Sequence, residues 1–168
     1  TLRRYMSLLE TTFLYAPLRP WSNARAKRLV KAPKIHITDS GFATHLCGIS
    51  SLSELAKSPL WGPLLETFVV NEIRKIMTWS KTSTECYHFR MDTGKEVDLV
   101  LEDARGRIVG IEVKSSASIN HSDFGGLMEL RDAAGDKWVR GIVLHTGPDV
   151  TPFTKDLHAV PMSGLWEW

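Results

Sequence analysis

Cysteine is scarce in this chain of 168 residues, which contains only Cys47 and Cys86. The two lie far apart and form no C-x-x-C pair. This arrangement excludes a disulfide framework and argues against a zinc site built from cysteine. We therefore interpret both as free thiols in a reducing compartment, and we expect a cytoplasmic protein.

Long apolar runs and several common signatures are also lacking. No stretch approaches the roughly 18 apolar residues that cross a membrane, and no signal-peptide pattern opens the chain. The pattern G-x-x-x-x-G-K-[ST] is absent, so ATP hydrolysis cannot reside in this chain. The six histidines are scattered without metal-ligand spacing, which favours structural or surface roles. Because the first residue is Thr and not Met, we expect a piece of a longer protein that continues upstream.

Acidic residues are almost missing from the first part of the chain. Residues 1–36 hold eight Lys/Arg against one acid, a net charge of +7, whereas residues 37–168 carry a net charge of −5. The total of +2 hides this division. A division of this kind indicates two functional parts, of which the basic one suits an anionic partner.

The hydrophobic pattern predicts a mixed α/β sheet covered by helices in the second part. Gly62-Pro63 is typical of a helix start. In chain order the pattern predicts a helix over 64–77, strands over 86–91, 95–102 and 107–114, a helix over 122–134 and a strand over 139–145. The first part is predicted to hold a helix over 1–10, strands over 13–18 and 34–38, and then mostly loop with one short helix over 42–60.

The hairpin between the strands at 95–102 and 107–114 decides which acidic residues can meet. A three-residue loop, 104–106, places Glu112 beside Asp98, whereas a two-residue loop would turn Glu112 to the opposite face. Gly106 suits the left-handed position that the three-residue loop favours. Strict alternation along the first strand predicts that Glu96 and Asp98 share a face opposite Val97, Leu99 and Leu101.

Two adjacent carboxylates repel each other unless a cation joins them. The oxygens of Asp98 and Glu112 suit Mg²⁺, with Mn²⁺ as a substitute, and Lys114 beside them can position or deprotonate a water. This combination suits phosphodiester hydrolysis. Glu66 has apolar neighbours on its helix and therefore needs a partner such as a metal or a base, although Glu72 also lies outside the polar arc of that helix.

Simpler interpretations remain open for each of these features. An E-x-K triplet in an alternating strand is usually a solvated face. A hairpin rich in acids and lysine can carry cross-strand ion pairs, and Glu66 can pair with a nearby arginine.

The spacing of Glu66, Asp98 and Glu112-Val-Lys114, between a helix and a later helix and strand, resembles the PD-(D/E)XK (restriction-endonuclease-like) nuclease superfamily with its αβββαβ core. Four segments resemble the uncharacterised C-terminal domain of bacterial and archaeal AAA-type ATPases: Tyr5 with Leu9-Glu10, 34–41, 62–72 and 96–115. The resemblance implies a nuclease-like domain over 58–168 in which Asp98, Glu112 and Val113 bind Mg²⁺, Lys114 serves the attacking water and Glu66 completes the site. The leading proline of the motif is replaced by Val97.

The same resemblance implies that residues 1–57 are part of a winged-helix segment and its linker, with the missing ATPase domain as a partner. DNA is the expected anionic partner of its basic side chains. The residues expected to contact DNA are Arg3, Arg4, Arg25, Lys27, Arg28 and Lys31. Two hypotheses follow: a divalent-metal-dependent nuclease-like domain acting on DNA, or a catalytically inactive DNA-binding or protein-interaction module of that ATPase. The basic loop can instead be simply solvated or packed on the ATPase domain.

Overall fold

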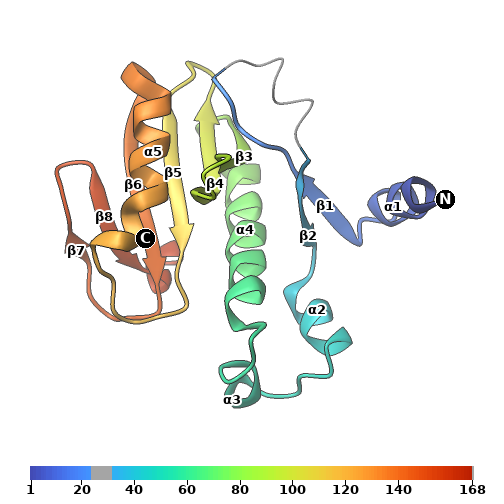
Figure 1. The fold of residues 1–168 in the computed structure, drawn as a ribbon. Helices are drawn as coiled ribbons and strands as arrows, with labels where there is room; N and C mark the ends of the chain where they lie inside the picture. Colours follow the sequence, from blue (N-terminus) through green and yellow to red (C-terminus); the bar gives the residue numbers. More distant parts are fainter. Residues whose placement is uncertain (24–31, 168) are drawn as a thin grey trace.

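The computed structural model describes residues 1–23 and 32–167. Its main element is a six-stranded sheet with the strand order β3-β4-β5-β6-β8-β7 (Figure 1). The strands are β3 (Thr84–Arg90), β4 (Glu96–Asp103), β5 (Ile108–Val113), β6 (Trp138–His145), β7 (Thr151–Pro152) and β8 (Leu157–Pro161). The pairs β3–β4, β4–β5 and β7–β8 are antiparallel, and the pairs β5–β6 and β6–β8 are parallel. The predicted mixed α/β architecture is therefore confirmed.

Two helices cover the sheet, one on each face. The helix α5 (Gly125–Ala134) buries Leu127 and Leu130 in one core, and α4 (Trp61–Trp79) buries Val69, Val70 and Ile73 in the other. At Gly126 the helix α5 approaches β4 so closely that an added Cβ would lie 2.0 Å from the carbonyl oxygen of Glu96. The sheet is thus enclosed between two apolar layers, as its nearly continuous hydrophobic strands require.

The N-terminal part forms a second, smaller layer against α4. The strands β1 (Tyr15–Leu18) and β2 (Lys34–Ile37) pair antiparallel, on the side of α4 away from the main sheet (Figure 1). The Asn71 side chain on α4 donates to the carbonyl of Ile37 (2.8 Å). After β1 the chain runs along the outer edge of β3, where Pro20 bridges His88. The N-terminal segment therefore both covers α4 and closes one edge of the sheet.

Short helices and late strands depart from the sequence prediction. The segment predicted as mostly loop with one short helix holds two helices, α2 (Ser40–Leu46) and α3 (Leu52–Leu55). The side chains of Asp39 and Ser51 cap them, accepting from backbone N–H groups three residues on. The strands β7 and β8 were not predicted. The first helix, α1 (Leu2–Thr11), buries no side chain. No helix in the described part of the chain is both long and apolar enough to cross a membrane.

The predicted hairpin register is confirmed. Leu99 pairs with Ile111 and Glu102 with Ile108, and the N–H of Asp103 donates to the carbonyl of Arg107 (3.1 Å). Gly106 adopts φ +78° in the three-residue loop, a left-handed conformation that favours glycine. The register ends at Leu99 and Ile111, one residue short of Asp98 and Glu112.

The predicted alternation along β4 is wrong at Asp98, because the strand contains a bulge. Tyr87 pairs with Val100 and Phe89 with Val97, so a single residue of β3 lies opposite both Asp98 and Leu99. Val97 and Val100 accordingly lie in the core under α5, and Leu99 lies in the core under α4. The extra residue turns Asp98 toward the α4 side, together with Leu99.

Candidate functional site

The candidate site lies where β4 and β5 cease to pair. One carboxylate oxygen of Asp98, Oδ2, accepts a hydrogen bond from the backbone N–H of Val113 (3.0 Å). This side-chain bond continues the ladder one step beyond the last backbone pair, Leu99–Ile111. Asp98 is only 6% exposed, although its side chain is charged. A buried carboxylate needs hydrogen-bond or ionic partners for both of its oxygens, and the second oxygen of Asp98 has such a partner.

The second oxygen of Asp98 accepts from Lys34, at the start of β2. The Lys34 ammonium lies 2.9 Å from Asp98 Oδ1 and 3.0 Å from Glu66 Oε1, so it joins strand β4 to helix α4. Burial opposes the charge on Lys34, but the carboxylates of Asp98 and Glu66 outweigh it and raise its pKa. Burial and the nearby Asp98 raise the pKa of Glu66. The predicted need of Glu66 for a partner is thus met by a lysine.

Glu112 and Lys114 form the other half of the site. Lys114 donates to Glu112 Oε1 (3.0 Å) and lies 4.0 Å from Asp123. The other oxygen, Glu112 Oε2, is buried and has no hydrogen-bond partner in the described structure. Burial, followed by repulsion from Asp98, raises the pKa of Glu112 to about 7. Glu112 is therefore a carboxylate that lacks part of its compensating positive charge.

Three residues at the site were missed by the sequence analysis. Lys34 and His36 come from β2, and Asp123 lies in the turn before α5, where its side chain accepts from the N–H of Asn120 (2.9 Å). The His36 ring lies 3.2 Å from the Thr67 hydroxyl and 3.8 Å from Glu66. Burial and the charges of Arg74 and Lys34 lower the pKa of His36 to about 4, so its ring is neutral near pH 7. The only available signal was the alternation in Lys34-Ile-His-Ile, which placed Lys34 and His36 on one face.

The residues present fit a divalent ion held by few protein ligands. Within residues 1–23 and 32–167, no three side chains of the types His, Cys, Asp and Glu lie close enough to share one ion. The orphaned Glu112 Oε2 is an oxygen that a cation would satisfy, and Asp98 Oδ1 already holds the ammonium of Lys34. Mg²⁺ commonly retains several waters and binds through one or two carboxylates. Glu66 reaches this pair through Lys34 and does not join it directly.

The predicted DNA-contacting residues divide into two groups. Arg3 and Arg4 lie exposed on α1. The other four lie outside the described residues: Arg25, Lys27, Arg28 and Lys31. A hollow of about 500 Å³ adjoins the candidate site, and its lining includes Lys34, His88, Arg90 and Asp92.

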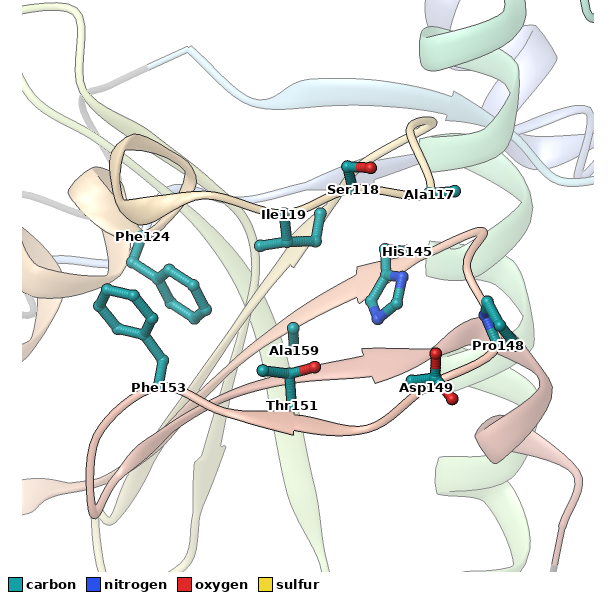
Figure 2. Close-up of a pocket in the computed structure, with 10 residues that line it drawn as sticks. All are labelled: Ala117, Ser118, Ile119, Phe124, His145, Pro148, Asp149, Thr151, Phe153 and Ala159. Atoms are coloured by element: carbon teal, nitrogen blue, oxygen red, sulfur yellow. The ribbon is translucent and has the colours of Figure 1, made fainter.

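A separate cavity of about 310 Å³ lies behind the loop that follows Lys114 (Figure 2). Phe124 and Phe153 stack along one side of it, with ring centroids 4.4 Å apart. The His145 ring on the other side accepts from the N–H of Gly147 (3.0 Å). The four predicted catalytic side chains are not among the residues that line this cavity.

Comparison with known proteins gives two family matches and two relatives. Residues 61–165 match the family described as a domain of unknown function (DUF4143), and residues 1–53 match another domain of unknown function (DUF8612). The chain is 30% identical over 163 residues to the uncharacterised proteins Mb2031c of Mycobacterium bovis and Rv2008c of Mycobacterium tuberculosis. The match covers 96% of this chain but only 34% of each relative, so the chain spans about a third of their length. No solved structure matches the chain.

Proposed function

Since the chain belongs to the DUF4143 family, whose description assigns no activity, we propose a function from the geometry of the site. We propose a divalent-metal-dependent phosphodiester hydrolase: a nuclease-like domain of the PD-(D/E)XK type that acts on DNA as part of a longer, ATPase-containing protein. The proposal concerns residues 61–165 together with Lys34 and the rest of β2.

The observation that carries the proposal is the unsatisfied oxygen of Glu112. Glu112 Oε2 is buried without a partner beside a second buried carboxylate, Asp98, and an ammonium, Lys114. An orphaned buried oxygen costs roughly 1–3 kcal/mol, and a cation bound at Glu112 would remove that cost. Functional sites are where such uncompensated groups gather.

Each residue would have a distinct task in this proposal. Asp98, Glu112 and the backbone at Val113 would hold Mg²⁺, or Mn²⁺ in its place, and the ion would supply Lewis-acid stabilisation of charge on the phosphate. Lys114, whose pKa the carboxylates of Glu112 and Asp123 raise, stays an ammonium and would orient a water or the phosphate by donating to it. Glu66 would hold Lys34 in position and balance its charge.

The surroundings support a phosphodiester substrate. The hollow beside Lys34 has Arg90, His88 and the acidic Asp92 in its lining, so two cationic side chains, Lys34 and Arg90, adjoin the carboxylates there. Nucleic acid backbones bind to such cationic surfaces by displacing counterions. The basic first part of the chain, with its net charge of +7, would add to this attraction.

The test is metal-dependent cleavage of linear and supercoiled DNA by the wild-type chain and by two variants. Asp98→Asn and Lys114→Ala should each lower the cleavage rate by at least about 100-fold, the usual size of a lost acid–base or charge-stabilising group. Asp98→Asn should also abolish Mn²⁺ binding in calorimetry. The matched controls are Asp132→Asn and Lys155→Ala, which change exposed side chains outside the site.

Cleavage that persists unchanged in Asp98→Asn and Lys114→Ala would refute the proposal, because a contaminant would then be responsible. The alternative is a catalytically inactive DNA-binding or interaction module. One observation favours it: Lys34 already supplies a cation to Asp98 and Glu66. That alternative predicts DNA binding without cleavage at any divalent-metal concentration.

A further inference from the structure

The place between Glu66 and Asp98 is filled by an ammonium group of the chain itself. Lys34 Nζ lies within hydrogen-bond distance of both carboxylates, at 3.0 and 2.9 Å. We propose that Lys34 is an internal cation that competes with the divalent metal for Asp98, so that the N-terminal segment controls metal access to the site. This inference rests on the proposed function, because it assumes that Asp98 is a metal ligand.

The position of Lys34 is fixed by the N-terminal layer. Lys34 is the first residue of β2, and it pairs with Leu18 of β1. Further along β2, Ile37 accepts from Asn71, and the His36 ring lies against Thr67 on α4. The ammonium therefore reaches the site from a layer separate from the strands that carry Asp98 and Glu112.

Lys34 and a divalent ion cannot both hold Asp98 without penalty. Asp98 Oδ2 is engaged by the N–H of Val113, so Oδ1 is the oxygen left for a cation, and Lys34 already holds it. Mg²⁺ binds its oxygens at roughly 2.0–2.1 Å, which would bring two positive centres close together at one carboxylate. Such repulsion is weakly screened at a buried position.

The hollow next to Lys34 leaves space for a second position of its side chain. The Lys34 side chain is 21% exposed and lines the hollow of about 500 Å³, whose lining also includes Asp92. A lysine has several rotatable bonds, so its head group can leave Asp98 while β2 stays in place. Asp92 would provide an acidic partner on that side. The Lys34 ammonium thus bridges Asp98 and Glu66 in this structure and has space in the hollow for a second position.

The experiment is Mn²⁺ and Mg²⁺ titration by calorimetry with wild type, Lys34→Met and the control Lys155→Met. Lys34→Met removes the charge at similar length, and it should raise metal affinity at least about 10-fold, equivalent to about 1.4 kcal/mol. Lys34→Arg retains the charge and should stay near the wild-type value. Lys155 lies exposed in the turn before β8, and its replacement should change nothing.

The outcomes separate the two proposals. Wild-type binding that disappears in Asp98→Asn but is unchanged or weakened in Lys34→Met supports the metal site and overturns competition by Lys34. No binding by wild type or by Lys34→Met overturns both. If Lys34→Met does not fold, the wild-type protein decides by NMR of the lysine side chains. The Lys34 Nζ signal should shift on saturation with Mg²⁺, and an unmoved signal would overturn the inference.

Discussion

Single side chains at this site are readable from the sequence only in part. The requirement that Glu66 have a partner follows from its apolar neighbours, and the partner exists. Its identity could not be predicted, because Lys34 is 32 residues away and reaches Glu66 only through the packing of β2 on α4. The role of Asp123 beside Lys114 could not be predicted either. In the sequence, Asp123 is an ordinary capping acid at the start of a helix.

At the residue scale, the raised pKa of Glu112 predicts a pH dependence of stability. Its pKa is about 7 in the folded protein against an ordinary 4.5, so the folded state binds more protons between these values. The free energy of unfolding should therefore fall as the pH rises through this window. Glu112→Gln has no ionisable group at this position, so its free energy of unfolding should not fall in this way. Without metal, the stability of the variant minus that of the wild type should therefore rise by about 1–3 kcal/mol between about pH 5 and about pH 8.

Urea unfolding in chelator-treated buffer measures this difference at the two pH values. A relative stability that does not change with pH would show that Glu112 has no raised pKa. Added Mn²⁺ should restore wild-type stability near pH 8 but leave Glu112→Gln less affected, because an ion that binds the folded state stabilises it.

Whole elements were more predictable than single contacts. The strands β3 to β6 and the helices α4 and α5 follow from hydrophobic period, and the β4–β5 register follows from the loop that ends in Gly106. The bulge at Asp98 and Leu99 does not, since it depends on how β3 aligns with β4 across the sheet. That one extra residue places Asp98 within reach of Lys34.

At the element scale, the close approach of α5 to β4 predicts that one added methyl group on α5 lowers the free energy of unfolding strongly. Gly126→Ala places its Cβ against the backbone carbonyl of Glu96, which cannot rotate away as a side chain could. We expect a loss of about 1–3 kcal/mol from overpacking. Gly62→Ala in α4 meets nothing within 4 Å and should be neutral or stabilising by up to about 1 kcal/mol.

Thermal and urea unfolding of the two alanine variants test this contrast. Equal stability of Gly126→Ala and Gly62→Ala would contradict the close packing of α5 on β4. Metal affinity of Gly126→Ala provides a second measurement, since β4 carries Asp98 and a displaced strand should weaken binding.

The whole molecule combines a basic N-terminal part with an acidic sheet domain. The helix α1 exposes apolar side chains, including Leu2 (74%) and Phe13 just after it (81%), and the chain spans about a third of its relatives. The charge division is visible in the sequence, whereas the exposure of these apolar side chains is visible only in the structure.

At this scale, the net charge of +7 on residues 1–36, within a total of +2, predicts salt-sensitive binding to duplex DNA. Arg28→Ala with Lys31→Ala should weaken binding and make the slope of log affinity against log salt shallower by about 1 for each phosphate that the protein no longer neutralises. Fluorescence anisotropy over a range of salt concentrations measures both. The control pair is Lys57→Ala with Lys155→Ala, both exposed. Equal slopes in the two double variants would show that Arg28 and Lys31 do not contact DNA.

The origin of Lys34 has a consequence for how family members are compared. The family match begins at residue 61, whereas the ammonium that balances Glu66 and Asp98 belongs to β2, in the region matched by the other family. A boundary drawn by sequence similarity therefore cuts through one electrostatic unit. A relative that keeps the three acids but lacks a lysine at the start of β2 would carry a different charge at its site. Surveys that rank such domains as active or inactive should therefore read both matched regions together.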